Sequence, residues 1–420
     1  MRDHVVDRKG SVLSSRSILK LDRLPPTGPA AIAEPTESIA PNYRKLKGLP
    51  IHGVAQPTID EMRALLLNIG SGPAIPANLR SSFSTPRKVT YWVNLRVEPL
   101  EYINGRPFVL RSEEDYKTPL SDYMGIEVTR LEQMELRLKE DVITESLDNS
   151  HKVMIHVEVY NTDSTGNALE SERVVTSWEA ISGTDAIKTP RQIYDTLASE
   201  GYKMQYIRLP VVISPKFHSP REYFDQFIKV VLESGILPRG NVVDNEDIDE
   251  EYCNRNELLF NSGVGYGRTT LAMVIAVLLF NGFTNFHKMK NHHLTHSPVE
   301  GSKSFKVIHN LLRVLPHGLS SKDQVDKAID RCSQFENLRD SILEYKIKAM
   351  NCHVFEIKQD YIEKAIYYLE QYFSLIAFAE YIQEMLSVFD ENSLDFKFYM
   401  SFKQWADQRQ EIWTLYDDLK

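Results

Sequence analysis

The feature of this sequence that most constrains its fold is a short apolar segment that enters a glycine-rich loop and then a helix-forming segment. Residues 257–260 are predicted to form a buried strand, and residues 269–280 are predicted to form a helix. Between them, glycine recurs at every second position, at Gly263, Gly265 and Gly267. A strand that feeds a helix through such a loop is typical of an α/β protein.

Strands and helices alternate in the sequence up to about residue 300, and only helices are predicted beyond it. Strands are expected over residues 88–95, 152–160, 173–178, 206–212 and 257–260, with a hairpin over 101–110. Helices are expected over residues 59–69, 128–144, 189–200, 220–234, 269–280, 303–315, 322–350, 359–386 and 402–419. We therefore expect three parts: an extended lead-in laid on the surface (1–40), an α/β domain (41–300) and a helical extension (301–420).

Composition and charge exclude several classes of protein. Apolar residues make up 42% of the 420 residues and charged residues 25%, as in ordinary globular chains. The net charge of −9 and the lack of a basic tract argue against a nucleic-acid partner. The three cysteines are too few for a disulfide framework and fit a reducing compartment. Residues 1–11 show no secretory signal. The apolar run 271–280 has about half the length that a membrane-spanning helix needs. The sequence thus predicts a cytoplasmic location and no transmembrane segment.

The glycine-rich loop has the chemistry of a phosphate-binding loop (P-loop). Alternate glycines allow successive backbone N–H groups to face one anion, and the following helix adds its positive end. Arg268 can bind phosphate through two hydrogen bonds. The residues expected to hold the ligand are Gly263, Val264, Gly265, Tyr266, Gly267, Arg268 and Thr269.

Other loops of this general kind do not fit the spacing. A Walker loop requires lysine before Thr269 and glycine at position 262, where the chain has Arg268 and Ser262. A dinucleotide-binding loop that starts at Gly263 would need glycine at position 268. A nucleophile elbow would need glycine in place of Phe260. The spacing that does fit is the Cys-x5-Arg loop of cysteine-dependent phosphatases, with Ser262 in the position of the cysteine.

Several other stretches carry a wider pattern. They are Ser11-Val12-Leu13, Ile18-Leu19-Lys20, Pro41-Asn42-Tyr43-Arg44-Lys45, residues 53–58, Val93-Asn94-Leu95-Arg96 and residues 102–107. Together with the loop, they resemble one repeat of the paladin family, which is related to the protein-tyrosine-phosphatase-like (PTP-like) phytases. The resemblance extends to about Trp405.

The resemblance implies a cysteine-phosphatase fold, with a central sheet flanked by helices, followed by an all-helical C-terminal extension. It implies phosphomonoester hydrolysis through a phosphocysteine, without metal or cofactor. The implied ligands are inositol phosphates, phosphoinositides or phosphoproteins. Other paladin repeats or another protein are the further partners that we expect.

Two departures from the family pattern bear on catalysis. Ser262 replaces the nucleophilic cysteine, and a serine hydroxyl is far less acidic than a thiol. The family's general-acid aspartate, just after an Arg-x-Pro strand end, has no counterpart in residues 208–215. A deliberate Cys-to-Ser replacement would explain only the first departure, whereas natural loss explains both. The sequence thus favours a pseudophosphatase that binds phosphate-bearing ligands; the alternative is a phosphatase whose nucleophile has been replaced.

Other candidate residues have a structural interpretation beside the functional one. Arg96 and Arg106 either line the anion pocket or take part in ion pairs. Asp225 is interpreted as a helix-surface residue and not as a displaced acid. A polar loop is favoured over a metal site for His287, His292, His293 and His296. Cys253 lies too far along the chain from Ser262 to replace the nucleophile. The acidic run 244–251 is expected to point away from the anion pocket. The aromatic residues of 361–373 are expected in a core or interface.

Overall fold

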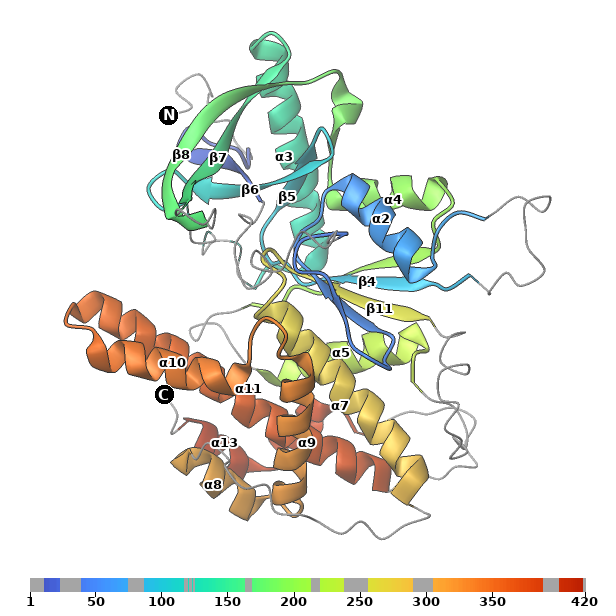
Figure 1. The fold of residues 1–420 in the computed structure, drawn as a ribbon, viewed down its shortest axis with the longest axis vertical. Coiled ribbons are helices and arrows are strands. Elements are labelled where there is room, and N and C mark those ends of the chain that lie inside the picture. The colour runs from blue at the N-terminus through green and yellow to red at the C-terminus, as the bar shows by residue number, and fades with distance from the viewer. Residues whose placement is uncertain are drawn as a thin grey trace. The chain divides into compact units, whose positions relative to one another are not determined.

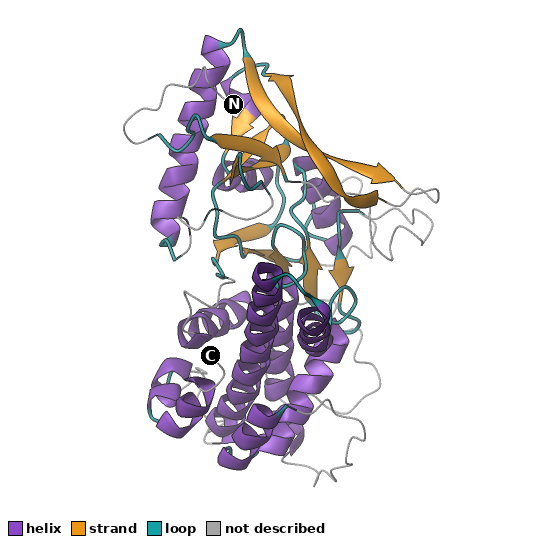
Figure 2. Cartoon of the chain, turned by 90° about the vertical axis from the view of Figure 1, so that its left-hand side faces the viewer, coloured by secondary structure: helices purple, strands orange, loops and turns teal. Residues whose placement is uncertain are grey.

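The computed structural model describes residues 11–22, 39–74, 87–116, 120, 123, 125–162, 168–212, 220–237, 256–289, 305–387 and 400–417. The chain forms two compact units, each assembled from separate segments. The first unit comprises Met1–Arg44, His52–Val212 and Leu259–Thr269, and the second comprises Lys45–Ile51, Ile213–Leu258 and Thr270–Lys420. The strands lie mostly in the first unit, and the second is almost entirely helical (Figures 1 and 2).

Two sheets organise the strands. The six-stranded sheet has the order β8-β7-β1-β6-β5-β9. Its strands are β1 (Ser17–Leu21), β5 (Leu100–Ile103), β6 (Arg106–Ser112), β7 (Lys152–Thr162), β8 (Ala168–Ala180) and β9 (Ile187–Lys188). The five-stranded sheet has the order β10-β4-β11-β3-β2. Its strands are β2 (Arg44–Lys45), β3 (Ile51–Val54), β4 (Thr90–Asn94), β10 (Met204–Arg208) and β11 (Glu257–Asn261).

The hairpin predicted from Asn104 and Gly105 is confirmed. These residues join β5 to β6 with φ angles of 50° and 76°, the left-handed pair that a two-residue type I′ turn requires. The expected strand over 206–212 differs: it begins earlier, as β10, which runs parallel to β4. It also ends earlier, at Arg208, two residues before Pro210, which has no N–H to donate.

Residues 17–21 are not part of a surface lead-in, in contrast to the expectation for residues 1–40. They form β1, which pairs antiparallel with β6 and parallel with β7, and Leu19 is fully buried. Five residues are too few for a clear strand period, so pairing with distant strands decides their conformation.

Among the described helices of the first unit, two begin with a capping box. The described α-helices of this unit are α2 (Ile59–Ile69), α3 (Val128–Asp148) and α4 (Pro190–Ser199). Thr58 and Glu61 form a capping box at the start of α2, and Thr189 and Gln192 form one at the start of α4. The buried faces of α2 and α4 join one hydrophobic core with Trp92 of β4.

The second unit is built around two long helices, α7 (Arg268–Met289) and α11 (Phe355–Ser387). Its other helices are α5 (Pro220–Ser234), α8 (Lys306–Val314), α9 (Gly318–Cys332), α10 (Leu338–Asn351), α12 (Phe402–Asp407) and α13 (Gln410–Asp417). Phe224 of α5 stacks on Phe378 of α11 with ring centroids 4.4 Å apart. Tyr372 and Phe373 are buried in this core, as expected for the aromatic residues of 361–373.

Two helices predicted as continuous are broken in the structure. The segment 322–350 divides into α9 and α10, because Asn337 accepts hydrogen bonds from the first N–H groups of α10. The segment 402–419 divides into α12 and α13. Among the described residues, no helix is both long and apolar enough to cross a membrane.

Candidate functional site

The candidate site lies in the first unit, where β11 ends and the loop 262–268 begins. The end of β11 is fixed by buried polar contacts of Asn261, whose Oδ1 accepts a hydrogen bond from Trp92 Nε1 at 2.9 Å. Asn261 Nδ2 donates to Gln56 Oε1 at 3.0 Å, and the backbone N–H of Leu95 donates to Asn261 O at 2.9 Å. These three contacts hold the start of the loop against β4 and the segment after β3.

The conformation of the loop depends on glycine at two positions. Gly265 and Gly267 have φ angles of 77° and 60°, in the region that favours glycine. A Cβ on Gly265 would also lie 2.5 Å from the backbone nitrogen of Ala55 and 2.8 Å from its Cα. The loop therefore passes so close to the residue after β3 that only hydrogen fits.

The carbonyl groups of the loop are engaged, whereas three of its N–H groups are not. The backbone N–H of Gln56 donates to Gly263 O at 3.0 Å, Asn42 Nδ2 donates to Val264 O at 2.8 Å, and Arg44 Nη1 donates to Gly265 O at 2.6 Å. Within the described part of the chain, the N–H groups of residues 263–265 donate to no protein group. This combination of occupied acceptors and available donors is that of an anion-binding nest.

Ser262 stands where the pattern places the nucleophile, and it is 1% exposed. Its Oγ lies 2.8 Å from Oγ1 of Thr269, in the first turn of α7, and 3.5 Å from the carbonyl oxygen of Tyr266. No histidine or carboxylate among the described residues is hydrogen-bonded to Ser262. Within the described ranges, the hydroxyl therefore has a structural partner and is hydrogen-bonded to no general base.

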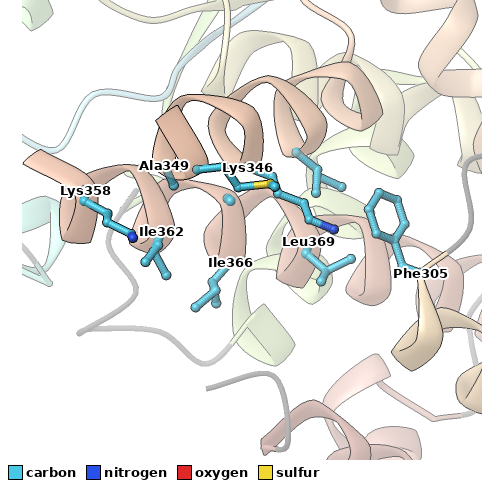
Figure 3. Close-up of a pocket in the computed structure, with 10 residues that line it drawn as sticks. Phe305, Lys346, Ala349, Lys358, Ile362, Ile366 and Leu369 are labelled. Carbon is cyan, nitrogen blue, oxygen red and sulfur yellow. The ribbon is translucent and has the colours of Figure 1, made fainter. Parts of the chain in front are cut away.

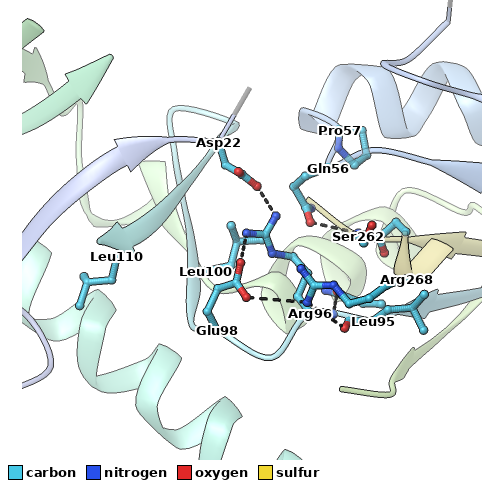
Figure 4. Close-up of polar contacts among 12 residues, drawn as sticks. Asp22, Gln56, Pro57, Leu95, Arg96, Glu98, Leu100, Leu110, Ser262 and Arg268 are labelled. Carbon is cyan, nitrogen blue, oxygen red and sulfur yellow. Dashed lines mark hydrogen bonds and ion pairs between the residues drawn. The ribbon is translucent and has the colours of Figure 1, made fainter. Parts of the chain in front are cut away.

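Arg268 closes the loop and lies beside a buried carboxylate. Its Nη1 donates to Leu95 O at 3.4 Å and lies 3.9 Å from Glu98 Oε2, and its side chain is 13% exposed. Figure 4 shows the guanidinium groups of Arg268 and Arg96 approaching the same Glu98 carboxylate. A 3.9 Å separation between Arg268 Nη1 and Glu98 Oε2 is an ion pair but not a close hydrogen bond.

Glu98 is the centre of a buried ionic cluster. Arg96 Nη2 donates to Glu98 Oε1 at 2.5 Å and Arg111 Nη2 lies 3.4 Å from the same oxygen, while Arg96 Nη1 pairs with Asp22. Burial alone would raise the pKa of Glu98, but the neighbouring guanidinium groups, above all those of Arg96 and Arg268, hold this pKa well below its usual range. The neighbouring arginines thus favour the ionised form of Glu98, although it is 1% exposed.

Arg208 extends this cluster beyond Glu98. Its Nε and Nη2 donate to the carbonyl oxygens of Arg96 and Glu98, both at 3.0 Å, and its Nη1 lies 3.3 Å from Glu135 Oε1. Burial raises the pKa of Glu135 to about 7, although Arg208 acts in the opposite direction.

The ionic cluster as a whole carries an excess of positive charge. Its members are Asp22, Arg96, Glu98, Arg111, Glu135, Arg208 and Arg268. Among the described members of the cluster, four arginines face at most three ionised carboxylates, which gives these members at least one net positive charge. Protonation of Glu135 increases this excess. The cluster therefore creates a potential that favours an anion next to Arg268.

The structure settles several of the alternatives left open by the sequence. Arg96 belongs to the buried cluster, whereas Arg106 pairs with Glu179 at 2.6 Å and is 36% exposed. Asp225 accepts hydrogen bonds from the backbone N–H groups of Phe402 and Lys403 at 2.6 and 3.1 Å, so it caps α12. The side chain of Arg208 is fully buried. The backbone N–H of Val211 donates a hydrogen bond to the carbonyl oxygen of Leu95.

Some of the sequence predictions fall outside the residues that the structure describes. They concern residues 213–215, the acidic run 244–251, Cys253, His292, His293 and His296, together with the side chain of His287. Within the described ranges, no group of three or more His, Cys, Asp or Glu side chains is arranged to hold a metal ion.

The roles of Glu98, Arg208 and Asp22 were not predicted from the sequence. A signal was present, because Asn94, Arg96 and Glu98 are polar residues at alternate positions, from the last residue of a buried strand onward. Charged side chains in such a place must be paired if they are buried. Their partners could not be found in the sequence, because Asp22 and Arg96 are 74 residues apart.

The chain is similar to the PTP-like phytases and to the paladins. The PTP-like phytase model, described as "Inositol hexakisphosphate", matches residues 93–280, which include the loop. Paladin from Homo sapiens is 24% identical over 391 residues, and paladin from Danio rerio is 24% identical over 389 residues. Each alignment covers 90% of this chain and 40% of the paladin, so the chain spans about two fifths of the length of these relatives.

Solved structures from Mitsuokella multacida also align with the chain. The tandemly repeated PTP-like phytase has 16% identity and a TM-score of 0.49, over 95% of this chain and 49% of that chain. A PTP-like myo-inositol phosphatase in complex with myo-inositol-(1,3,4,5)-tetrakisphosphate has 15% identity and the same TM-score and coverage.

Proposed function

We propose that this chain, a member of the family formed by the paladins and the PTP-like phytases, binds phosphate-bearing ligands through the loop 262–268 and lacks efficient phosphatase activity. One observation carries the binding half of this proposal: the loop has occupied carbonyls, three available N–H groups and a terminal arginine. The description of the family model suggests inositol hexakisphosphate as the first ligand to test. Phosphoinositides and phosphoproteins carry the same chemical group and remain further candidates.

The geometry of the loop supports anion binding through three cooperating groups. The N–H groups of residues 263–265 are available donors, the first turn of α7 follows directly, and Arg268 adds a full positive charge. Val264 and Tyr266 are 38% and 39% exposed, so the loop is accessible from solvent. A phosphate group accepts hydrogen bonds from backbone donors and from a guanidinium at the same time.

Replacing Arg268 with alanine is expected to weaken inositol hexakisphosphate binding by at least about thirtyfold, since truncating one partner of a close charge pair costs about 2–5 kcal/mol. Isothermal titration calorimetry of the full chain measures this loss. Arg106→Ala is the matched control, because Arg106 is also ion-paired but lies outside the ionic cluster. Equal affinities for Arg268→Ala and the unchanged chain would refute the binding site.

The catalytic half of the proposal follows from Ser262 and from the missing acid. The hydroxyl of Ser262 is paired with Thr269, and no base is hydrogen-bonded to it among the described residues. The segment 208–215 contains no carboxylate that could protonate the leaving group. General acid catalysis contributes about 10²–10⁴ in rate, so the loss of the acid alone would be severe.

Ser262→Cys restores the family's nucleophile without restoring the acid. Thr269 is placed to donate a hydrogen bond to the new sulfur, and Arg268 and the start of α7 favour its thiolate form. We expect phosphate release from inositol hexakisphosphate to remain about 10²–10⁴-fold below that of an intact PTP-like phytase. A rate equal to the intact enzyme would show that another residue supplies the proton.

The second candidate function is phosphomonoester hydrolysis by a chain whose nucleophile cysteine has been replaced by Ser262. The observation in its favour is that the rest of the loop keeps the Cys-x5-Arg arrangement, from Gly263 to Arg268. The gene sequence separates the two candidates, because a cysteine codon at position 262 supports the enzyme and a serine codon supports the binding protein. The cytoplasmic location and the association with other paladin repeats remain proposals.

A further inference from the structure

The helical hairpin of α10 and α11 exposes several apolar side chains where its two helices are joined. We define the hairpin tip as residues 346–358, which contain the end of α10, the connection and the start of α11. Figure 1 shows the two helices side by side. Five apolar side chains of the tip are exposed: Ile347 (58%), Met350 (70%), Val354 (53%), Phe355 (78%) and Ile357 (47%).

The hairpin tip is also cationic, in contrast to the chain as a whole. It contains Lys346, Lys348 and Lys358 but one acidic residue, Glu356, so its net charge is +3 − 1 = +2 with His353 neutral. The whole chain carries −9. Lys346 directly precedes Ile347, and Lys358 directly follows Ile357, so lysines bracket the exposed apolar side chains.

The apolar surface continues from the hairpin tip into a groove of about 340 Å³ along α10 and α11. Figure 3 shows Lys346 and Lys358 at this groove, with Ile362, Ile366 and Leu369 along α11. Hydrocarbon stems of lysine can cover apolar surface while the ammonium groups reach a polar layer.

The lysines of the hairpin differ in whether they form ion pairs. Lys348 pairs with Glu344 at 2.6 Å, and Lys364 pairs with Asp360 at 2.7 Å. In contrast, Lys346 and Lys358 form no ion pair with any described residue. The side of the hairpin that carries the groove therefore combines apolar side chains with uncompensated positive charge.

We propose that the hairpin tip docks on a lipid bilayer that contains anionic phospholipids. Its exposed side chains surround the end of a hairpin, a convex shape that can enter the boundary between headgroups and acyl chains. Apolar insertion together with attraction of lysines to anionic lipid is how surface-bound helices attach to membranes. Phe355 and Met350 enter the apolar boundary, while Lys346 and Lys358 remain at the level of the phosphate groups.

Sedimentation of the full chain with vesicles tests this docking. One set of vesicles contains phosphatidylcholine alone, and the other also contains phosphatidylserine. We expect binding to the phosphatidylserine vesicles and at least about tenfold weaker partition into vesicles of phosphatidylcholine alone. The absence of binding to phosphatidylserine vesicles would overturn the proposal.

Substitutions on the hairpin tip locate the contact. Phe355→Ser is expected to reduce partition by at least about tenfold, since a large apolar side chain no longer enters the bilayer. Leu319→Ser is the matched control, because Leu319 is 77% exposed and lies on α9. The double variant Lys346→Gln and Lys358→Gln is expected to lose about 25-fold, from about fivefold for each lysine. Lys327→Gln, whose lysine pairs with Asp323, controls for loss of an exposed lysine.

Other occupants of the hairpin tip give different results. Dimers that Phe355→Ser abolishes, with no vesicle binding, would overturn the proposal and assign the tip to self-association. Equal losses in Phe355→Ser and Leu319→Ser would also overturn it. The proposal does not rest on the phosphate-binding loop, so Arg268→Ala should keep full partition into phosphatidylserine vesicles. If Arg268→Ala abolished that partition, the contact would belong to the loop and docking by the tip would be refuted.

Discussion

Glu98→Ala is expected to lower the free energy of unfolding of the first unit by about 3–5 kcal/mol, the usual cost of removing one partner from a buried ion pair. Arg96 is 1% exposed and loses its 2.5 Å contact with Glu98 in this variant. Arg111 and Arg268 lose the same carboxylate. The guanidinium groups then repel one another in a poorly solvated region, because arginine does not lose its proton.

Urea denaturation followed by circular dichroism and by tryptophan fluorescence measures the effect of Glu98→Ala. Glu179→Ala is the matched control, since Glu179 also pairs with an arginine but is 24% exposed. An exposed pair contributes about 0–1 kcal/mol, so this control should change the stability little. If the two variants unfolded at the same urea concentration, Glu98 would not have the central electrostatic role assigned to it.

Gly265→Ala is expected to destabilise the first unit by about 2–5 kcal/mol. About 1–2 kcal/mol comes from placing a Cβ on a residue with a left-handed φ, here 77°. About 1–3 kcal/mol more comes from overpacking, because the Cβ would lie 2.5 Å from the backbone nitrogen of Ala55. The chain can relieve this clash only by moving the loop away from β3, which would also displace the N–H groups proposed to bind phosphate.

Gly125→Ala separates the two contributions to the effect of Gly265→Ala. Gly125 has a nearly identical φ of 78°, but a Cβ there would meet nothing within 4 Å. The control should therefore show only the backbone cost of about 1–2 kcal/mol. Thermal unfolding and the affinity for inositol hexakisphosphate are measured for both variants. Equal destabilisation and unchanged affinity would contradict the close approach of the loop to Ala55.

The turn between β11 and α7 could be predicted from the sequence because it depends on local residues. The spacing of Gly263, Gly265 and Gly267 predicts a tight loop, and Gly265 and Gly267 have left-handed φ angles in the structure. The structure adds which loop atoms are engaged: the carbonyl groups of residues 263–265 accept hydrogen bonds from residues 42–56. Spacing cannot show this, because the donors are more than 200 residues away in the chain.

Local rules account for the elements that the sequence determined by itself. Caps and turns depend on residues within about four positions of one another, as in the capping box of Thr58 and Glu61 and the turn at Asn104 and Gly105. The alternation of strands and helices, and the change to helices after residue 300, follow from hydrophobic periodicity in the same local way.

Only the tertiary structure decided which charged residues are buried together and which apolar residues remain exposed. Asp22 and Arg96 meet across 74 residues, and β1 becomes a strand because β6 and β7 flank it. Phe355, apolar and on a helix, gives no sign in the sequence that it is 78% exposed. Burial and ion pairing depend on distance in space, and that distance is set by the packing of the whole chain.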